Sequence, residues 1–300
     1  MEKAIQCKPF LKWAGGKGQL IEEIATHLPD SISDIDTYVE PFIGSGAVMF
    51  WLVNRYQNIK KVVINDLNTD LTNLYFSIKF DVDGLIGVLK ELDAKYRSIH
   101  TQEERSVLYY QIRNEYNSRP LDYKDINNRI SALFIFLNRT CFNGLYRVNR
   151  KNLFNVPFGK YNNPRIVDEE NLRKVNELLQ KVEILNGDYA ETIKYANNKA
   201  FFYLDPPYKP ITETSSFNSY SSTSFDDEQQ KRLKDFCDYI NKNNGLFMLS
   251  NSDPKSVDET NDFFDKLYGD YNIHRVLAKR NINSKGDRRG TINELLITNY

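Results

Sequence analysis

Short apolar runs alternate with amphipathic stretches along most of the chain. The amphipathic stretches predict helices, because acidic residues lie in their first turn and apolar residues recur on one face, as at 168–181 and 226–240. Strands that alternate with helices are typical of a mainly parallel sheet covered by helices on both faces. The runs that we predict as strands are 37–40, 60–65, 182–186, 201–205, 245–251, 275–279 and 294–298.

One block departs from this alternation. Residues 76–165 indicate helices at 103–117 and 126–137, followed by a stretch rich in Asn, Arg and aromatic residues. We therefore expect two domains: an α/β domain formed by residues 1–75 and 166–300, and a mainly helical domain at 76–165 that is inserted into it.

The composition is that of an ordinary globular protein, with 300 residues, 41% of them apolar, and 40 basic against 40 acidic side chains. Apolar runs such as 132–137 are far shorter than the ~18 residues of a membrane-spanning helix, and no secretion signal is evident. Cys7, Cys141 and Cys237 lack a C-x-x-C spacing, and the three histidines are isolated. We expect a cytoplasmic protein with no membrane contact and no bound metal.

The zero net charge conceals an uneven distribution. Residues 127–167 contain no acid but seven basic side chains, and residues 274–290 contain six basic side chains against Asp287 alone. Such segregation favours a polyanionic partner. The seven basic residues of the first segment are Arg129, Arg139, Arg147, Arg150, Lys151, Lys160 and Arg165.

The tetrapeptide Asp205-Pro206-Pro207-Tyr208 directly follows the apolar run 201–204. Two prolines cannot continue a central strand, so the chain leaves the sheet here, at the edge where open α/β sheets bind ligands. The Asp205 carboxylate and the Pro206 carbonyl can accept both N–H bonds of a planar exocyclic amine and turn its lone pair toward an electrophile. Tyr208 can stack on the ring that carries the amine.

A glycine turn, EPFIGSG at 40–46, lies between a predicted strand and an apolar helix. Gly44 and Gly46 permit a tight turn and close approach of a ligand. Asp66, about twenty residues further on at the end of the next strand, has the position of a carboxylate that binds ribose hydroxyls. Met49 replaces the third glycine of the dinucleotide fingerprint, but the combination still indicates an adenosine-containing cofactor.

Two further segments contribute candidates. The hexapeptide KWAGGK is not a P-loop, because Leu11 stands where the first glycine belongs, but Lys17 could meet a carboxylate and Trp13 could cover a pocket. Asp188 follows the predicted strand 182–186 at the same sheet edge. A nucleoside cofactor beside a site that holds an amine fits S-adenosylmethionine, whose sulfonium methyl is the required electrophile.

The order KWAGGK, EPFIGSG, NDLN, an insert with NRTCFNGLYRVN and FNVPFGKY, then GD and DPPY resembles the Dam-type DNA adenine N6-methyltransferases over nearly the whole chain. The resemblance implies a class I S-adenosylmethionine-dependent methyltransferase fold: a Rossmann-like, seven-stranded mixed sheet whose last strand is antiparallel. It also implies direct methyl transfer without a metal, with Asp205, Pro206, Pro207 and Tyr208 as the catalytic tetrapeptide. The positions that match the family's cofactor contacts are Trp13, Ala14, Gly15, Lys17, Pro41, Phe42, Gly44, Gly46, Asp66, Asp188 and Asp205.

By the same resemblance the insert is the target-recognition domain for double-stranded DNA. Arg139 and Arg147 can reach guanine edges or phosphates, and Asn143 or Asn149 can bond an adenine edge. Phe142, where some relatives carry Tyr, could wedge into the stack as the adenine leaves the duplex, because flipping a base costs a few kcal/mol, about what aromatic stacking returns. Further family positions near the recognised bases are Lys12, Leu145, Pro157 and Tyr161.

NRTCFNGLYRVN is similar to the segment used by GATC-reading members, so we predict 5′-GATC as the target, with a cognate restriction endonuclease as a candidate partner. An N4-cytosine methyltransferase has the same chemistry and stays an alternative. A cofactor-liganded DNA-binding regulator would not need DPPY. RNA is disfavoured because its major groove is too narrow. A nicotinamide-dependent oxidoreductase would have no use for Asp205 and Tyr208.

Overall fold

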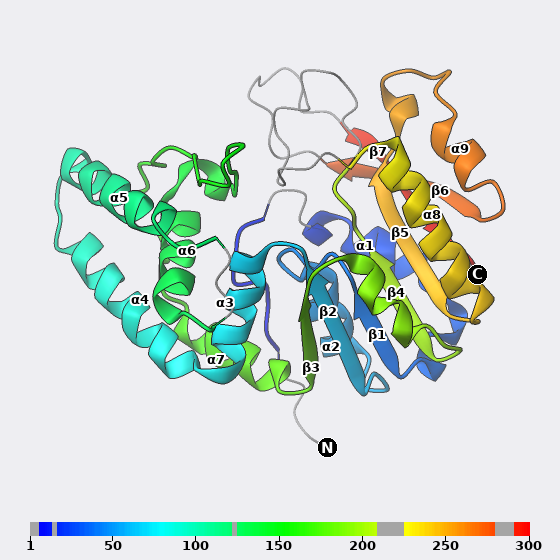
Figure 1. Cartoon of the computed structure of the whole chain (residues 1–300), viewed down its shortest axis with the longest axis horizontal. Coiled ribbons are helices and arrows are strands. Elements are labelled where there is room, and N and C mark those ends of the chain that lie inside the picture. Colours follow the sequence, from blue (N-terminus) through cyan, green and yellow to red (C-terminus); the bar gives the residue numbers. More distant parts are fainter. Residues whose placement is uncertain (1–5, 14–16, 122–124, 209–224, 280–290) are drawn as a thin grey trace.

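The computed structural model of the chain describes residues 6–13, 17–121, 125–208, 225–279 and 291–300. A seven-stranded sheet lies at the centre of one half, and a group of helices lies beside its β3 edge (Figure 1). The strands are β1 (Thr37–Glu40), β2 (Lys61–Asp66), β3 (Val182–Asn186), β4 (Ala200–Leu204), β5 (Leu246–Ser252), β6 (Asn272–Lys279) and β7 (Thr291–Thr298).

Helices cover the sheet and form the insert. None of those in the described ranges combines the length and the apolar character that crossing a bilayer requires. They are α1 (Ile21–Thr26), α2 (Ala47–Arg55), α3 (Thr69–Phe80), α4 (Val82–Arg97), α5 (Gln102–Asn117), α6 (Asn128–Thr140), α7 (Glu169–Leu179), α8 (Asp227–Lys242) and α9 (Phe263–Leu267).

The strand order is β3-β2-β1-β4-β5-β7-β6, and this order creates the site. Strands β1 to β5 pair in parallel, whereas β7 is antiparallel to both of its neighbours. The predicted seven-stranded mixed sheet with an antiparallel last strand is thereby confirmed. From the central pair β1 and β4 the chain continues toward opposite edges, which opens a crevice at their carboxyl ends, the usual ligand position in such sheets.

Both faces of the sheet are buried, with side chains alternating between them. Val39 and Phe202 belong to a core with residues of α8 and α9, whereas their neighbours Tyr38 and Phe201 belong to a core on the opposite face. That second core continues through α2 and α3 into α4, α5 and α6. The insert therefore shares one contiguous hydrophobic core with the sheet.

Helix α3 connects the two halves. Asn68 caps its N-terminus, because the side-chain oxygen accepts the backbone N–H groups of Asp70 and Leu71 at 3.1 and 3.2 Å. The helix then runs without interruption through residues 75 and 76, where we predict a domain boundary, and it contacts β2, β3, α6 and α7. The division into two domains stays a prediction.

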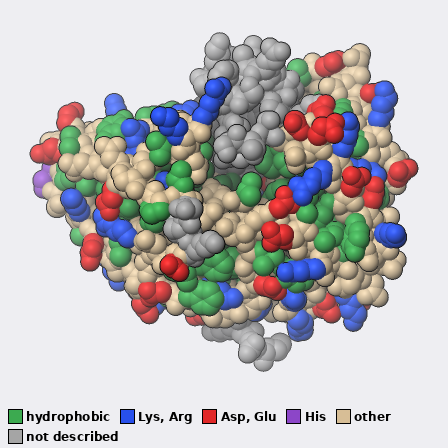
Figure 2. Space-filling view, viewed as in Figure 1, with side chains coloured by type: hydrophobic (Ala, Val, Ile, Leu, Met, Phe, Trp, Pro, Cys, Tyr) green, Lys and Arg blue, Asp and Glu red, His purple; other side chains and the backbone are tan. Residues whose placement is uncertain are grey.

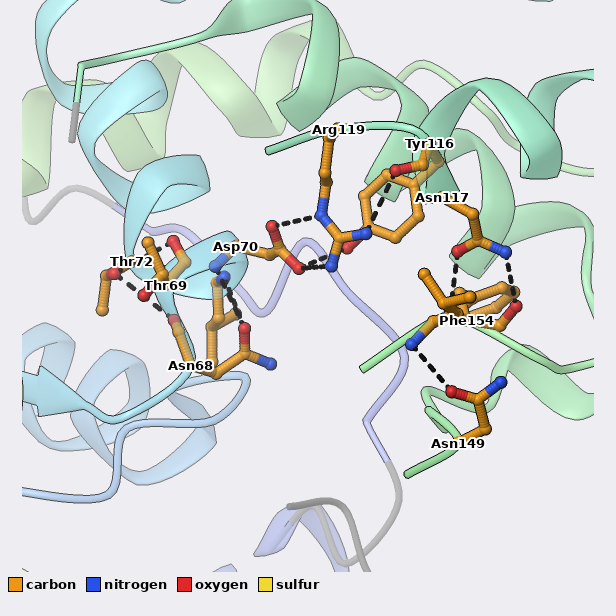
Figure 3. Close-up of polar contacts among 11 residues, drawn as sticks. Asn68, Thr69, Asp70, Thr72, Tyr116, Asn117, Arg119, Asn149 and Phe154 are labelled. Atoms are coloured by element: carbon orange, nitrogen blue, oxygen red, sulfur yellow. Dashed lines mark hydrogen bonds and ion pairs between the residues drawn. The ribbon is translucent and has the colours of Figure 1, made fainter. Parts of the chain in front are cut away.

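A buried ion pair fixes α3 to the insert (Figure 3). The side chains of Asp70 and Arg119 are 5% and 2% exposed, and the guanidinium contacts both carboxylate oxygens, with Nε 2.7 Å from Oδ1. The Tyr116 hydroxyl donates to the same carboxylate at 2.8 Å, and the guanidinium lies 4.0 Å from the centre of the Tyr116 ring. Every charge at this junction is satisfied, so the loss of one partner leaves the other buried and uncompensated.

Arg119→Ala should lower the free energy of unfolding by about 3–5 kcal/mol, because the Asp70 carboxylate would stay buried without its counter-charge. Urea denaturation followed by circular dichroism measures the change. The matched control is Arg129→Ala, which removes an exposed pair to Glu115 whose side chains are both 45% exposed, and it should cost at most about 1 kcal/mol. Equal losses in the two variants would contradict this account of the junction.

Candidate active site

A cavity of about 910 Å³ opens at the carboxyl ends of β1, β2 and β4. Its walls come from both halves of the chain, since the sheet side supplies the predicted motifs and the insert side supplies Arg119, Leu121, Tyr146 and residues 150–152. The sequence-predicted residues among those that line it are Trp13, Lys17, Pro41, Phe42, Gly44, Asp66, Asp188, Asp205, Pro206, Pro207 and Tyr208.

The glycine turn at 40–46 leads from β1 to α2. Gly44 and Gly46 have φ values of +47° and +70°, a region that favours glycine. Packing adds a second reason: a Cβ on Gly44 would lie 3.1 Å from the Trp13 indole, and a Cβ on Gly46 would lie 2.9 Å from the Tyr75 hydroxyl. Gly46 is buried below the turn, so of the two glycines Gly44 faces the cavity.

Asp66 ends β2 and holds this turn. Its carboxylate accepts the backbone N–H groups of Gly44 at 3.1 Å and of Asn68 at 2.9 Å. Burial raises the pKa of the carboxyl above its ordinary value, against the opposing effect of these hydrogen bonds. The adjacent Asn65 donates to the carbonyls of Pro41 and Gly187. The Asn65 amide and the Asp66 carboxylate thus hold the end of β2 to the turn that follows β1.

Asp188 lies beyond β3 and is bonded to α8. Both of its oxygens accept from the guanidinium of Arg232 at 2.8 Å, and Oδ1 also accepts the Ala190 N–H. The hydrogen bond from Arg232 holds the pKa of Asp188 below its ordinary value. The same guanidinium lies 4.9 Å from the centre of the Tyr189 ring. An ionised carboxylate therefore lines this part of the cavity with an arginine bound to it.

The predicted tetrapeptide surrounds a buried lysine. Lys17 Nζ lies 2.9 Å from Asp205 Oδ1 and 4.5 Å from the centre of the Tyr208 ring. The Tyr208 hydroxyl donates to Glu294 Oε2 at 2.7 Å and lies 3.1 Å from the Ser250 hydroxyl. Glu294 Oε2 is also 3.9 Å from Lys17 Nζ. The sequence prediction that Lys17 meets a carboxylate is confirmed by this ion pair.

Burial raises the pKa of Asp205 to about 6, and Glu294 contributes in the same direction, whereas Lys17 lowers it. Burial by itself lowers the pKa of Lys17, but the neighbouring acids, Asp205 first, raise it above its ordinary value. Near neutral pH the pair is therefore a carboxylate beside an ammonium ion, and Asp205 is an acceptor that mild acid would remove.

The predicted DNA-contacting residues gather at one end of the insert. Phe142 is 52% exposed, and its backbone N–H donates to the Pro157 carbonyl at 2.8 Å. Lys12 Nζ lies 4.7 Å from the centre of the Tyr161 ring. Asn143 is exposed with φ +56°, and half-buried Leu145 follows it. Segments 142–145 and 157–161 are thus adjacent, with Lys12 against the second.

Other predicted DNA contacts make bonds within the protein. Arg139 is half-buried and donates to the Phe10 carbonyl at 2.7 Å. The Nε of Arg147 donates to Asn155 at 2.7 Å. The Asn149 side-chain oxygen accepts the backbone N–H groups of residues 151 and 153, so it caps a turn (Figure 3 shows Asn149 beside Phe154). Contacts of these three side chains with DNA stay predictions. Ala14 and Gly15, predicted cofactor contacts, lie outside the described residues.

The basic segment 127–167 is only partly available to a polyanion. Arg129 and Arg165 pair with Glu115 and Asp168. Figure 2 shows Lys and Arg side chains in blue along the upper edge of the insert. Within the described ranges the basic side chains of this segment that form no ion pair are Arg139, Arg147, Arg150, Lys151 and Lys160.

Sequence reasoning missed several residues of the cavity wall. Glu294 lies within β7, and only the sheet order brings it to Tyr208. Arg232 looks like any exposed helical cation in the sequence. Glu40 belongs to the glycine-turn motif, but the sequence indicates no role for it. Its carboxylate is buried and accepts a hydrogen bond from the Tyr38 hydroxyl at 2.7 Å. Burial raises the pKa of Glu40 well above its ordinary range.

A sheet of this order, with a glycine turn, a strand-end acid and DPPY around one cavity, has the arrangement of the S-adenosylmethionine-dependent methyltransferases that act on amines. The family model of the D12 class N6 adenine-specific DNA methyltransferases matches residues 13–282. The chain belongs to this family, and it is a site-specific, adenine-specific DNA methyltransferase.

Relatives align over almost the whole chain. Type II methyltransferase M.MjaIII of Methanocaldococcus jannaschii is 47% identical, covering 99% of this chain and 100% of the relative. Type II methyltransferase M1.LlaDCHI of Lactococcus lactis subsp. cremoris is 38% identical, covering 99% and 96%. DNA adenine methylase of Escherichia coli is 32% identical, covering 96% and 94%.

D12 methyltransferases use S-adenosylmethionine, and the cavity fits this cofactor. The side-chain oxygen of Asn65 and the Tyr189 hydroxyl are buried without a hydrogen-bond partner among the described residues. Both residues line the cavity, together with the Asp66 carboxylate and the apolar side chains of Phe42 and Leu67. Acceptors beside apolar faces suit an adenosine with its amine and hydroxyls, and the bound cofactor supplies the methyl group.

The kcat/KM of methylation should fall as the pH decreases through about 6, because protonated Asp205 loses an acceptor for the substrate amine. In Lys17→Met this acid limb should move to higher pH, since the charge that lowers the Asp205 pKa is gone. A pH–rate profile with labelled cofactor measures both. Lys231→Met, which changes an exposed α8 lysine, should leave the limb in place. An unmoved limb in Lys17→Met would remove the assignment to Asp205.

Proposed function

We propose that the chain methylates N6 of the adenine in 5′-GATC of double-stranded DNA, and that this adenine is flipped out of the duplex into the cavity. The observation that carries the proposal is the position of Asp205 and Tyr208 on the wall of a cavity that both halves of the chain enclose. A base stacked in a duplex cannot reach such a wall, so it must leave the stack. The volume, about 910 Å³, is near the upper end for ligand sites and supports a cofactor and a base together.

The tetrapeptide residues have distinct roles in this proposal. The Asp205 carboxylate and the Pro206 carbonyl accept the two N–H bonds of the adenine amine, which directs the nitrogen lone pair toward the methyl group. Lys17 holds Asp205 in place and covers one face of the Tyr208 ring, so the base stacks on the other face. The protein mainly orients and desolvates the reactants, which accounts for a large part of the barrier reduction in such sites.

The cofactor is held by the residues around the glycine turn. Asp66 and Asp188 supply carboxylates, Phe42 supplies an apolar face, and Gly44 permits close approach. Trp13 packs behind Gly44 and keeps the turn closed. Support comes from their common position on one cavity wall at neighbouring strand ends.

DNA is read by the exposed end of the insert. Phe142 is the side chain placed to enter the stack, since it is large, apolar and 52% exposed. Among the described residues only Asn155 bonds the Arg147 guanidinium, which leaves donors for a guanine edge. Arg150, Lys151 and Lys160 are exposed and suit phosphates. The likeness of the segment 138–149 to that of GATC-reading members supports the target.

We also propose a cognate restriction endonuclease as a partner in the same system. Two of the relatives are named type II methyltransferases, and these two are also the relatives of higher identity reported above. Protection of DNA requires that a nuclease read the same site that the enzyme modifies. Resistance of the methylated duplex to an endonuclease that cuts unmethylated 5′-GATC reports this match.

Labelled S-adenosylmethionine with a GATC duplex should give N6-methyladenine, and a duplex with the site scrambled should give none. Asp205→Ala should lower the rate at least ~10²-fold, the scale of one lost transition-state contact, with DNA binding retained. Asp238→Ala, which removes an α8 carboxylate paired with Lys234, should stay active. Digestion of the DNA and identification of the modified nucleoside distinguish the outcomes, and methylation of both duplexes overturns the target.

Arg147→Ala should cost ~1–3 kcal/mol of discrimination at one base pair of the site, because a guanine edge would lose its donors. Lys151→Ala should instead weaken binding to every duplex and reduce the salt dependence, as expected for a phosphate contact. Competition binding against single-substitution duplexes at several salt concentrations separates the two. A sequence-independent loss in Arg147→Ala would reassign this residue to the backbone of the DNA.

A further inference from the structure

Tyr146 lies between two residues that we propose to face DNA, Leu145 and Arg147, but it is turned into the protein. It is 2% exposed. Its ring stacks on the Trp13 indole with a centroid distance of 5.2 Å and an interplanar angle of 17°. The Tyr146 ring also contacts Phe134 of α6, with 5.0 Å between the ring centroids. The loop that we propose to read bases is therefore anchored directly against a residue of the cofactor side.

The stack continues to the glycine turn. The Trp13 indole occupies the space beside Gly44, since a Cβ there would lie 3.1 Å from it. Tyr146 and Asn68 also line the same cavity. Asn68 donates its N–H to the Asp66 carboxylate at 2.9 Å and caps α3. Tyr146 thus stacks on the residue that packs against the turn, and it shares the cavity wall with the residue that bonds the strand-end acid.

Hydrogen bonds from one side-chain amide join the same segments. Asn138 of α6 accepts the Lys12 N–H at 2.9 Å and donates to the carbonyls of Lys12 at 2.7 Å and Gly144 at 3.1 Å. The carbonyl before Trp13 and the carbonyl two residues before Tyr146 are therefore bound by one side-chain amide. A displacement of the reading loop has to be followed by the segment that carries Trp13.

We propose that Tyr146 is a positioning residue that couples reading of the target sequence to cofactor binding. The inference rests on the proposed DNA contacts of Leu145 and Arg147. When these side chains engage the matched site, Tyr146 presses Trp13 against the glycine turn, so the cofactor binds more tightly. Reciprocity requires that the cofactor tighten binding of the matched duplex by the same factor. The packed chain from base to turn is the physical path for this coupling.

The test measures the dissociation constant of S-adenosylhomocysteine, an unreactive analogue, by calorimetry with no DNA, a GATC duplex and a scrambled duplex. In the unaltered protein the GATC duplex should tighten binding at least about 5-fold, the lower end of typical allosteric coupling. Tyr146→Leu should reduce this factor below about 2-fold, and Tyr146→Phe, which keeps the ring, should restore most of it. Tyr109→Leu is the matched control: Tyr109 is an equally buried insert tyrosine whose hydroxyl bonds the Val156 carbonyl, and its loss should leave the factor unchanged.

Each outcome decides the matter. A factor in Tyr146→Leu equal to that of the unaltered protein overturns the coupling role, as does an equal drop in Tyr109→Leu. If the scrambled duplex tightens binding of the analogue as much as the GATC duplex does, the proposed target fails. A loss of this tightening that is confined to Tyr146→Leu still supports the coupling. If Tyr146→Leu does not fold, a second measurement takes its place. It uses the Trp51→Phe variant, in which Trp13 is the single tryptophan, and follows the fluorescence emission of Trp13. The GATC duplex should change that emission without cofactor, and an unchanged spectrum overturns the proposal.

Discussion

The buried ammonium group of Lys17 is the constraint to which the rest of the site is adapted. With only 5% of its side chain exposed it has given up its water, so a counter-charge within hydrogen-bond reach is required. Asp205 supplies it, and Glu294 lies near enough to contribute while it accepts the Tyr208 hydroxyl. One buried charge therefore orients the carboxylate and the aromatic ring of the tetrapeptide together. Burial of the Asp205 carboxylate in the same place raises its own pKa.

The parts of the site that could be predicted from the sequence are those governed by backbone rules. Prolines at 206 and 207 cannot continue a central strand, and glycines at 44 and 46 permit a turn that other residues resist. Because parallel strands present their carboxyl ends at one edge, acids that close such strands converge without any knowledge of the packing. The carboxylates of Asp66 and Asp205 therefore line one cavity, as their positions in the sequence indicate.

The parts that could not be predicted depend on which hydrogen-bonding groups the protein uses for its own internal bonds. A sequence gives the type of a side chain, not whether its hydrogen bonds are already made. Arg139 donates to the Phe10 carbonyl and the Asn149 oxygen caps a turn, and no local pattern in the sequence distinguishes these groups from unbonded ones. Glu294 depends on the insertion of β7 between β5 and β6, a property of sheet order. Tyr146 lies in a polar motif, and its inward orientation depends on the stack with Trp13.

The two carboxylates that pair with the Lys17 ammonium come from distant points of the chain, Asp205 after β4 and Glu294 on β7. During synthesis, a growing chain that has left the ribosome as far as α8 already possesses the glycine turn and DPPY. It still lacks the carboxylate that fixes the Tyr208 hydroxyl. Contacts between segments so far apart form late and slowly. In an unfinished chain Tyr208 therefore lacks the acceptor that orients it, and the capacity to methylate follows only when β7 joins the sheet.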